Sequence, residues 1–162
     1  MEVVVDFKDA HLLTKVALVT ISVADLILLI GVSTNYWYHE SYRYLIHLGN
    51  PHFGLWRGGY YLSFWQATQA MECIGLILGV IALILVILYL FVDQFRGNKN
   101  IVLYSLVSAI AAGIFITIGI IIWGTHYPSY QLGWSFALAC VGGVFLFLAG
   151  LLLIPEKKPQ LI

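Results

Sequence analysis

Apolar residues run along this chain in four long blocks that are separated by short polar connections. The blocks cover residues 16–34, 67–92, 101–124 and 132–154. Because the hydrocarbon core of a bilayer is about 30 Å thick and needs about 20 apolar residues in a helix, each block predicts a transmembrane helix. The connection at residues 93–100 is short and contains Gly97, so the second and third helices should form an antiparallel hairpin.

Between the first two blocks, at residues 35–65, the pattern changes to one typical of strands. Residues 41–48 alternate in polarity, with the apolar side chains on one face: Tyr42, Tyr44, Ile46 and Leu48. Gly58-Gly59 then separates residues 55–57 from residues 60–62, which indicates a tight hairpin. We expect a small antiparallel sheet of three or more strands. An interfacial amphipathic helix is the alternative, which the glycines would interrupt.

The composition places the chain among integral membrane proteins. Of its 162 residues 61% are hydrophobic and 10% are charged, and the mean hydropathy is +0.92. Four spans leave too few residues for a separate soluble catalytic domain. We therefore expect one domain over residues 1–162, an all-α membrane protein in which a four-helix transmembrane bundle carries a small extracellular antiparallel sheet.

The distribution of Lys and Arg predicts the orientation in the membrane, because cytoplasmic flanks retain positive charge during insertion. Six of these eight residues flank the spans on one side: Lys8, Lys15, Arg96, Lys99, Lys157 and Lys158. Arg43 and Arg57 lie on the other side. Both termini should be cytoplasmic, and residues 35–65 should lie outside.

Trp37 and the run Gly54-Leu55-Trp56 resemble the signature of the claudin, peripheral myelin protein and epithelial membrane protein superfamily. Residues 65–71 and 130–136 resemble the family's second and fourth spans where these begin. The resemblance covers essentially the whole chain, and the lens fibre intrinsic protein and small claudin-domain branches look nearest. It implies that Trp37, Gly54, Leu55 and Trp56 anchor the extracellular sheet to the membrane surface.

One departure from that family concerns cysteine. Family members carry two cysteines in the first external loop, and here Gly59 stands at about the position of the first one. Both cysteines of this chain, Cys73 and Cys140, fall inside predicted spans. A disulfide typically contributes about 2–4 kcal/mol, so this sheet must depend more on aromatic packing.

Asp25 and Glu72 are the acids within the apolar blocks, and an intramembrane carboxyl group is a candidate functional group. At about 1.5 Å per residue, Asp25 lies about 14 Å from residue 34 and Glu72 about 9 Å from residue 66, so we expect similar depths. The two can then meet in a polar clasp between spans one and two, sharing a hydrogen bond with each other or with Gln69. A proton or cation site and contact with a partner helix are the alternatives.

Small residues recur along the spans and predict close helix contacts, since lipid gives no hydrophobic drive for helix association. They include Gly75, Gly79, Ala109, Gly113 and Gly143. Most of these contacts should be internal to the bundle. A lipid-facing set would instead dock a partner.

Other sites receive little support from the sequence. Histidines gather on the external side, at positions 39, 47, 52 and 126, without cysteines or metal-ligand spacing. We expect no metal site and no cofactor. Phosphate loops, nucleophile elbows and paired-carboxylate active sites do not occur in the polar connections, so enzyme activity and nucleic-acid binding are not expected.

The leading hypothesis is a non-enzymatic tetraspan protein of the plasma membrane that organises cell–cell contacts or membrane assemblies by self-association. The alternative is an accessory subunit that binds a larger membrane channel or receptor. A lesser alternative is an ion or proton pathway. In each case membrane lipids surround the helices, and the partner is either a second copy of the chain or a larger membrane protein.

Overall fold

The computed structural model describes residues 12–39, 52–56 and 62–154. It contains four long helices: α1 (Leu12–Ser33), α2 (Ser63–Phe91), α3 (Lys99–Gly124) and α4 (Trp134–Leu152). All four are long and apolar enough to cross a membrane. The chain is therefore a multi-pass, four-span membrane protein, and the helical bundle predicted from the apolar blocks is confirmed.

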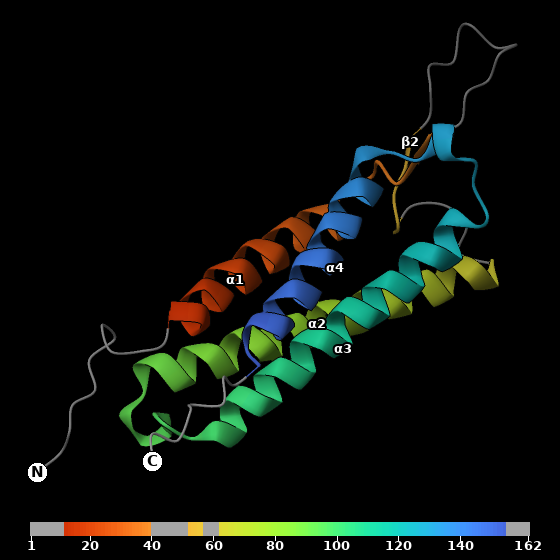
Figure 1. Ribbon diagram of the computed structural model, residues 1–162. Helices are drawn as coiled ribbons and strands as arrows, with labels where there is room; N and C mark the ends of the chain where they lie inside the picture. The colour runs from red at the N-terminus through yellow and green to blue at the C-terminus, as the bar shows by residue number, and fades with distance from the viewer. Residues whose placement is uncertain (1–11, 40–51, 57–61, 155–162) are drawn as a thin grey trace, which may run out of the picture.

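The helices associate as two pairs. α1 packs mainly on α4, and α2 packs mainly on α3; α3 also packs along α4, whereas α1 and α2 share the smallest of these interfaces (Figure 1). The start of α1, the end of α4 and the α2–α3 connection lie at one end of the bundle, here called the hairpin end. The strands and the α3–α4 connection lie at the opposite end, called the sheet end.

Small residues bring the helices close together. A Cβ atom on Gly142 would lie 3.1 Å from the Leu28 side chain of α1, and one on Gly143 would lie 2.7 Å from the Ile116 side chain of α3. Two adjacent glycines thus let α4 pack closely against both α1 and α3. Such backbone approach is how helices associate in lipid, where packing replaces the hydrophobic drive.

The five small residues singled out in the sequence all lie inside the bundle. Gly75 faces Ile116, Gly79 faces α1, Gly113 faces α4, Gly143 faces α3, and Ala109 is fully buried. Their close contacts are with neighbouring helices of the same chain. A partner that docks on the outer surface of the described spans would therefore not meet these five residues.

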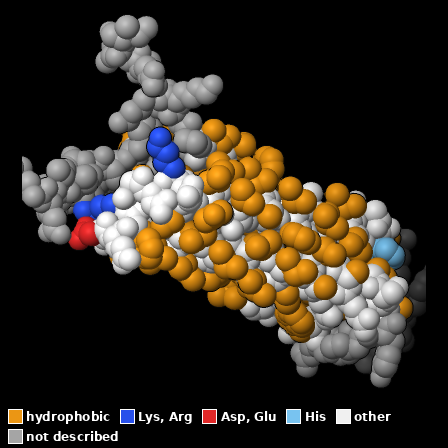
Figure 2. All heavy atoms as spheres, turned by 90° about the horizontal axis from the view of Figure 1, so that it is seen from below, with side chains coloured by type: hydrophobic (Ala, Val, Ile, Leu, Met, Phe, Trp, Pro, Cys, Tyr) orange, Lys and Arg blue, Asp and Glu red, His pale blue; other side chains and the backbone are white. Residues whose placement is uncertain are grey.

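The outer surface of the spans is apolar. Figure 2 shows hydrophobic side chains over the middle of the molecule, with Lys, Arg and acidic groups at one end and a histidine near the other. Ile77, Val107 and Val144 are among the most exposed of these apolar side chains. A continuous surface of this kind suits the hydrocarbon of a bilayer, which we take to cover it.

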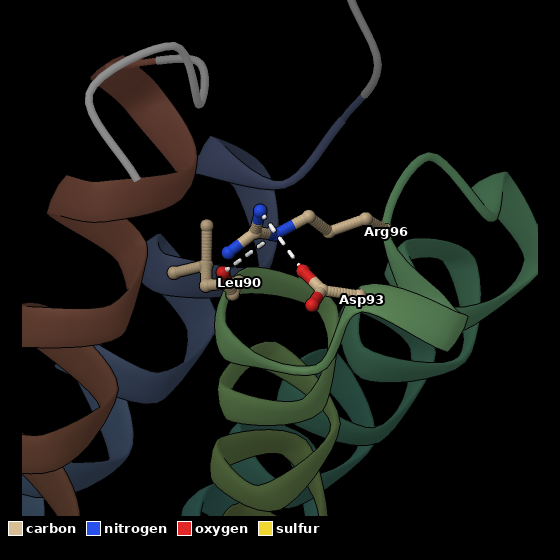
Figure 3. A network of polar contacts seen from close by, with 3 residues as sticks. All are labelled: Leu90, Asp93 and Arg96. Atoms are coloured by element: carbon tan, nitrogen blue, oxygen red, sulfur yellow. Dashed lines mark hydrogen bonds and ion pairs between the residues drawn. The ribbon is translucent and has the colours of Figure 1, made fainter. Parts of the chain in front are cut away.

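A compact turn closes the hairpin end. After α2 come the short helix η2 (Asp93–Phe95) and Gly97, which has φ 75° and is suited to this left-handed backbone. Arg96 Nε donates to the Leu90 carbonyl at 3.3 Å, and Arg96 Nη1 pairs with Asp93 Oδ1 at 3.1 Å (Figure 3). The arginine thereby satisfies an otherwise free carbonyl at the end of α2. The predicted antiparallel hairpin is confirmed.

At the sheet end, β1 (Tyr38–His39) pairs antiparallel with β2 (His52–Phe53). Tyr38 lies opposite Phe53 and His39 opposite His52, and Tyr38 also forms a bridge with Leu132 just before α4. The predicted antiparallel sheet is present, but its described part is short. The strand predicted at residues 41–48 and the Gly58-Gly59 hairpin lie outside the described residues.

The strand predicted at residues 55–57 is wrong for the two residues that the structure describes. Leu55 and Trp56 form a turn after β2. Leu55 is fully buried, and its carbonyl accepts side-chain hydrogen bonds from α2, while the Trp56 indole bonds to α1. These contacts draw the segment down onto the helix ends and away from a ladder of backbone pairs.

Candidate functional sites: an aromatic cap and two buried carboxyl groups

The first site is called the cap. It consists of β1, β2, the turn at residues 54–56 and residues 132–135, where α4 begins. Trp37 joins it to α1. Its indole Nε1 donates to the Gly31 carbonyl at 2.7 Å, and its backbone N–H donates to the Phe53 carbonyl at 3.0 Å. Gly31 lies in the last turn of α1, where carbonyls have no partner within the helix. Trp37 therefore completes α1 and holds the sheet to it.

The run Gly54-Leu55-Trp56 makes the second attachment. Trp56 Nε1 donates to the Val32 carbonyl of α1 at 2.9 Å, so a second indole satisfies the last turn of that helix. A Cβ on Gly54 would overlap the side chain of Asn35 and lie 2.6 Å from its Cα. The close approach of the turn to α1 therefore needs glycine at this position.

Leu55 attaches the same turn to α2. Its carbonyl accepts hydrogen bonds from Trp65 Nε1 and from Gln69 Nε2, each at 2.7 Å. The predicted hydrogen bond between Gln69 and an intramembrane acid is wrong. Gln69 instead helps to attach the cap to α2. The buried Leu55 carbonyl is a neutral acceptor for the Gln69 amide near the start of that helix.

The start of α4 is the third attachment. Gly133 N donates to the Trp37 carbonyl at 3.0 Å, and Ser135 N donates to the Tyr36 carbonyl at 3.2 Å. Ser135 Oγ and Thr34 Oγ1 form a hydrogen bond of 2.7 Å. A Cβ on Gly133 would collide with the Tyr36 carbonyl. In the sequence, the signal for this contact is a glycine directly before an aromatic helix start.

Aromatic rings fill the space between the cap and the helices. Trp123 of α3 is fully buried at its centre, with ring centroids 5.3 Å from Trp37, 4.6 Å from Trp65 and 5.2 Å from Tyr127. Most of these contacts are edge-on, the arrangement that aromatic quadrupoles favour. Trp123 could not be recognised from the sequence, because one tryptophan near a span end looks like an ordinary interfacial residue.

The second site lies within the bundle and holds the two acids. Asp25 Oδ1 contacts Gly79 of α2, where a Cβ would overlap it, and a Cβ on Gly119 of α3 would lie 2.8 Å from Glu72 Oε1. Asp25 is 7% exposed and Glu72 is 0% exposed. Among the described residues, none forms a hydrogen bond with the oxygens of either carboxyl group.

The predicted clasp between these acids does not form. Asp25 joins α1 to α2 as expected, but it meets α2 at Gly79, which lies seven residues beyond Glu72. At about 1.5 Å per residue, Gly79 and Glu72 are about 10 Å apart along α2. The expected depths were counted from the span ends alone. Side chains tilt toward the N-terminus of their own helix, so the side chains of two antiparallel helices tilt in opposite directions.

The described residues bring together no three His, Cys, Asp or Glu side chains that could hold a metal ion. His39 and His52 face each other across the sheet with ring centroids 6.4 Å apart, and His126 stacks on Phe64 at 3.9 Å. Cys73 and Cys140 are free and half-buried. In the described part of the chain, the ring contacts of these histidines and the partial burial of these cysteines fit roles in packing.

No protein-family model and no curated protein matches this chain. The likeness to the claudin superfamily therefore rests on the residues of the chain itself and stays a prediction.

Proposed function

We propose that this chain is a claudin-like, non-enzymatic tetraspan protein that organises contacts between cells by associating with copies of itself. In this proposal it lies in the plasma membrane with both termini in the cytoplasm and the cap outside. The observation that carries the proposal is the set of three indole N–H groups, from Trp37, Trp56 and Trp65, that bind the cap to the helix ends. These are the positions at which the chain resembles the superfamily.

A rigid cap is what a contact protein needs. His39 and His52 pair in register at the ends of β1 and β2, and residues 40–51 join these two strands along the chain. That segment carries Tyr42, Tyr44 and Ile46. We assign these side chains the contact with the same segment of another copy; residues 40–51 themselves lie outside the described residues.

The three indole hydrogen bonds also supply stabilisation of the kind that a disulfide in the first external loop would give. A buried hydrogen bond contributes about 1 kcal/mol net, so the three together contribute about 3 kcal/mol. One disulfide contributes about 2–4 kcal/mol. The two means of holding the sheet are therefore comparable in free energy, and the absence of external cysteines does not argue against a fixed cap.

The accessory-subunit alternative depends on the spans. Because the small residues singled out in the sequence face the interior, a partner helix would meet branched side chains such as Ile77, Ile81 and Ile84 on α2. These side chains suit lipid equally well. Self-association through the cap therefore has the more specific support.

The test is where the protein gathers in cells. Two cell populations that express differently coloured copies should show enrichment at contacts between expressing cells, and no enrichment where the neighbour lacks the protein. Replacing Tyr42, Tyr44 and Ile46 by Ser should abolish enrichment and leave surface delivery unchanged. Tyr130→Ser, at a site that is 71% exposed, is the control and should keep it. Even distribution of normally delivered wild-type protein would refute the proposal.

A further inference from the structure

The two buried acids have surroundings that no role in the cap explains. Each carboxyl group contacts the backbone of a neighbouring helix at a glycine, Asp25 at Gly79 and Glu72 at Gly119. The hydrogen that a Cβ would replace on each glycine faces a carboxyl oxygen. The chain thus leaves out a side chain on the opposite helix at both points and fits a carboxyl group into the space.

The groups around the acids do not include a cation. Gly79 and the Leu146 side chain of α4 lie beside Asp25. Near Glu72 lie Gly119 of α3 and the Met71 side chain. Within the four helices, Lys and Arg occur only at Lys15 and Lys99, in the first turn of α1 and of α3.

An ionised carboxylate in such a place is very costly. Moving an isolated carboxylate from water into an apolar medium costs tens of kcal/mol by the idealised Born estimate, and groups in proteins become neutral instead. A neutral carboxylic acid against a glycine backbone costs far less, about 1–3 kcal/mol for a buried polar group without a hydrogen-bond partner, and weak C–H···O contacts offset part of that. The geometry therefore suits the acid form of both residues.

We propose that Asp25 and Glu72 are two separate intramembrane proton-binding sites, each of which carries an exchangeable proton against a glycine of the neighbouring helix. The ligand is the proton, because each carboxyl group stands against a glycine of the neighbouring helix, and the described residues bring together no three His, Cys, Asp or Glu side chains that could hold a metal ion. Release of the proton places a carboxylate against the α1–α2 interface at Asp25 and against the α2–α3 interface at Glu72. Proton occupancy therefore controls how tightly these helices pack.

A second polar side chain of α2 lies beside the Glu72 site. Thr68 lies one turn before Glu72 on α2 and is fully buried. Its Oγ1 donates to the Phe64 carbonyl at 3.0 Å and lies 3.5 Å from the Gly119 carbonyl. Thr68 and Glu72 thus both approach α3 at Gly119, so a change in the charge of Glu72 acts at a point where two polar side chains of α2 meet the backbone of α3.

Infrared spectroscopy of the full chain in lipid vesicles tests the proposal directly. A protonated carboxylic acid has a carbonyl band distinct from that of a carboxylate and of the amide backbone. Wild-type protein at neutral pH should show this band and shift it in D₂O. Asp25→Asn and Glu72→Gln should each remove part of it, and the double variant should remove it completely. Asp93→Asn, at the exposed residue paired with Arg96, is the control and should leave it unchanged.

Two further measurements separate a proton site from its alternatives. Raising the pH should replace the acid band reversibly and lower the melting temperature of the wild type more than that of the double variant. Identical spectra of wild type and double variant, or a band that never yields to alkaline pH, would overturn the proposal. Loss of the band on adding sodium at constant pH would also overturn it, since it would identify a cation site.

Discussion

Gly133→Ala is the sharpest test of how α4 holds the cap. The added methyl group would collide with the Tyr36 carbonyl and lie 2.6 Å from the Tyr36 carbonyl carbon. These are backbone atoms, and two hydrogen bonds fix them, from Gly133 N to Trp37 O and from Ser135 N to Tyr36 O. Overpacking costs about 1–3 kcal/mol, and losing both bonds costs about 1 kcal/mol each. We expect a destabilisation of about 3–5 kcal/mol.

The assay is thermal unfolding of the purified protein in mild detergent, followed by tryptophan fluorescence. At about 3 °C per kcal/mol for a chain of this size, the melting temperature should fall by about 10 °C or more. Gly124→Ala is the matched control, because its Cβ would meet nothing closer than a Phe136 ring atom at 3.7 Å. If both variants melt alike, α4 does not hold the cap and the reasoning fails.

Three further changes give distinct outcomes. Trp56→Ala removes both the ring and its bond to the Val32 carbonyl and should reduce surface delivery, measured by surface biotinylation, more than Trp56→Phe, which loses the bond but keeps a ring; normal delivery with lost cell-contact enrichment would contradict the anchoring role. Gly79→Ala should lower the melting temperature because its methyl group meets Asp25, and Asp25→Ala should restore part of the loss, whereas additive effects would exclude the contact. Ser105→Ala removes a buried bond of 2.9 Å between α3 and α2 and should cost about 0.6–1.7 kcal/mol in a denaturant titration; no measurable change would show that the bond adds nothing.

The helices could be predicted from the sequence because lipid imposes a simple rule. A span needs a continuous apolar run, so residues 67–92 predicted α2 (Ser63–Phe91) to within a few residues. The apolar runs did not predict the helix ends that extend beyond them into the cap. α2 begins before its apolar run, because the Leu62 carbonyl accepts from the N–H groups of Trp65 and Gln66 and extends the helix into the aromatic cluster.

The sites were less predictable because they depend on which helix faces which. Trp37 and Trp56 were identified from a resemblance, but their acceptors, the last carbonyls of α1, follow from the fold of the chain after that helix. The clasp between Asp25 and Glu72 was wrong because depth along two helices does not fix which neighbour each side chain meets. That information lies in small residues such as Gly79 and Gly119, whose opposite partners the sequence does not reveal.

The measurement that tests the account most directly is native mass analysis of the complex purified from native membranes in mild detergent. A protein that organises contacts by self-association should appear as multiples of the 18.1 kDa chain. Replacing Tyr42, Tyr44 and Ile46 by Ser should return it to a single chain. A fixed ratio of this chain to a larger channel or receptor would contradict self-association and identify an accessory subunit instead.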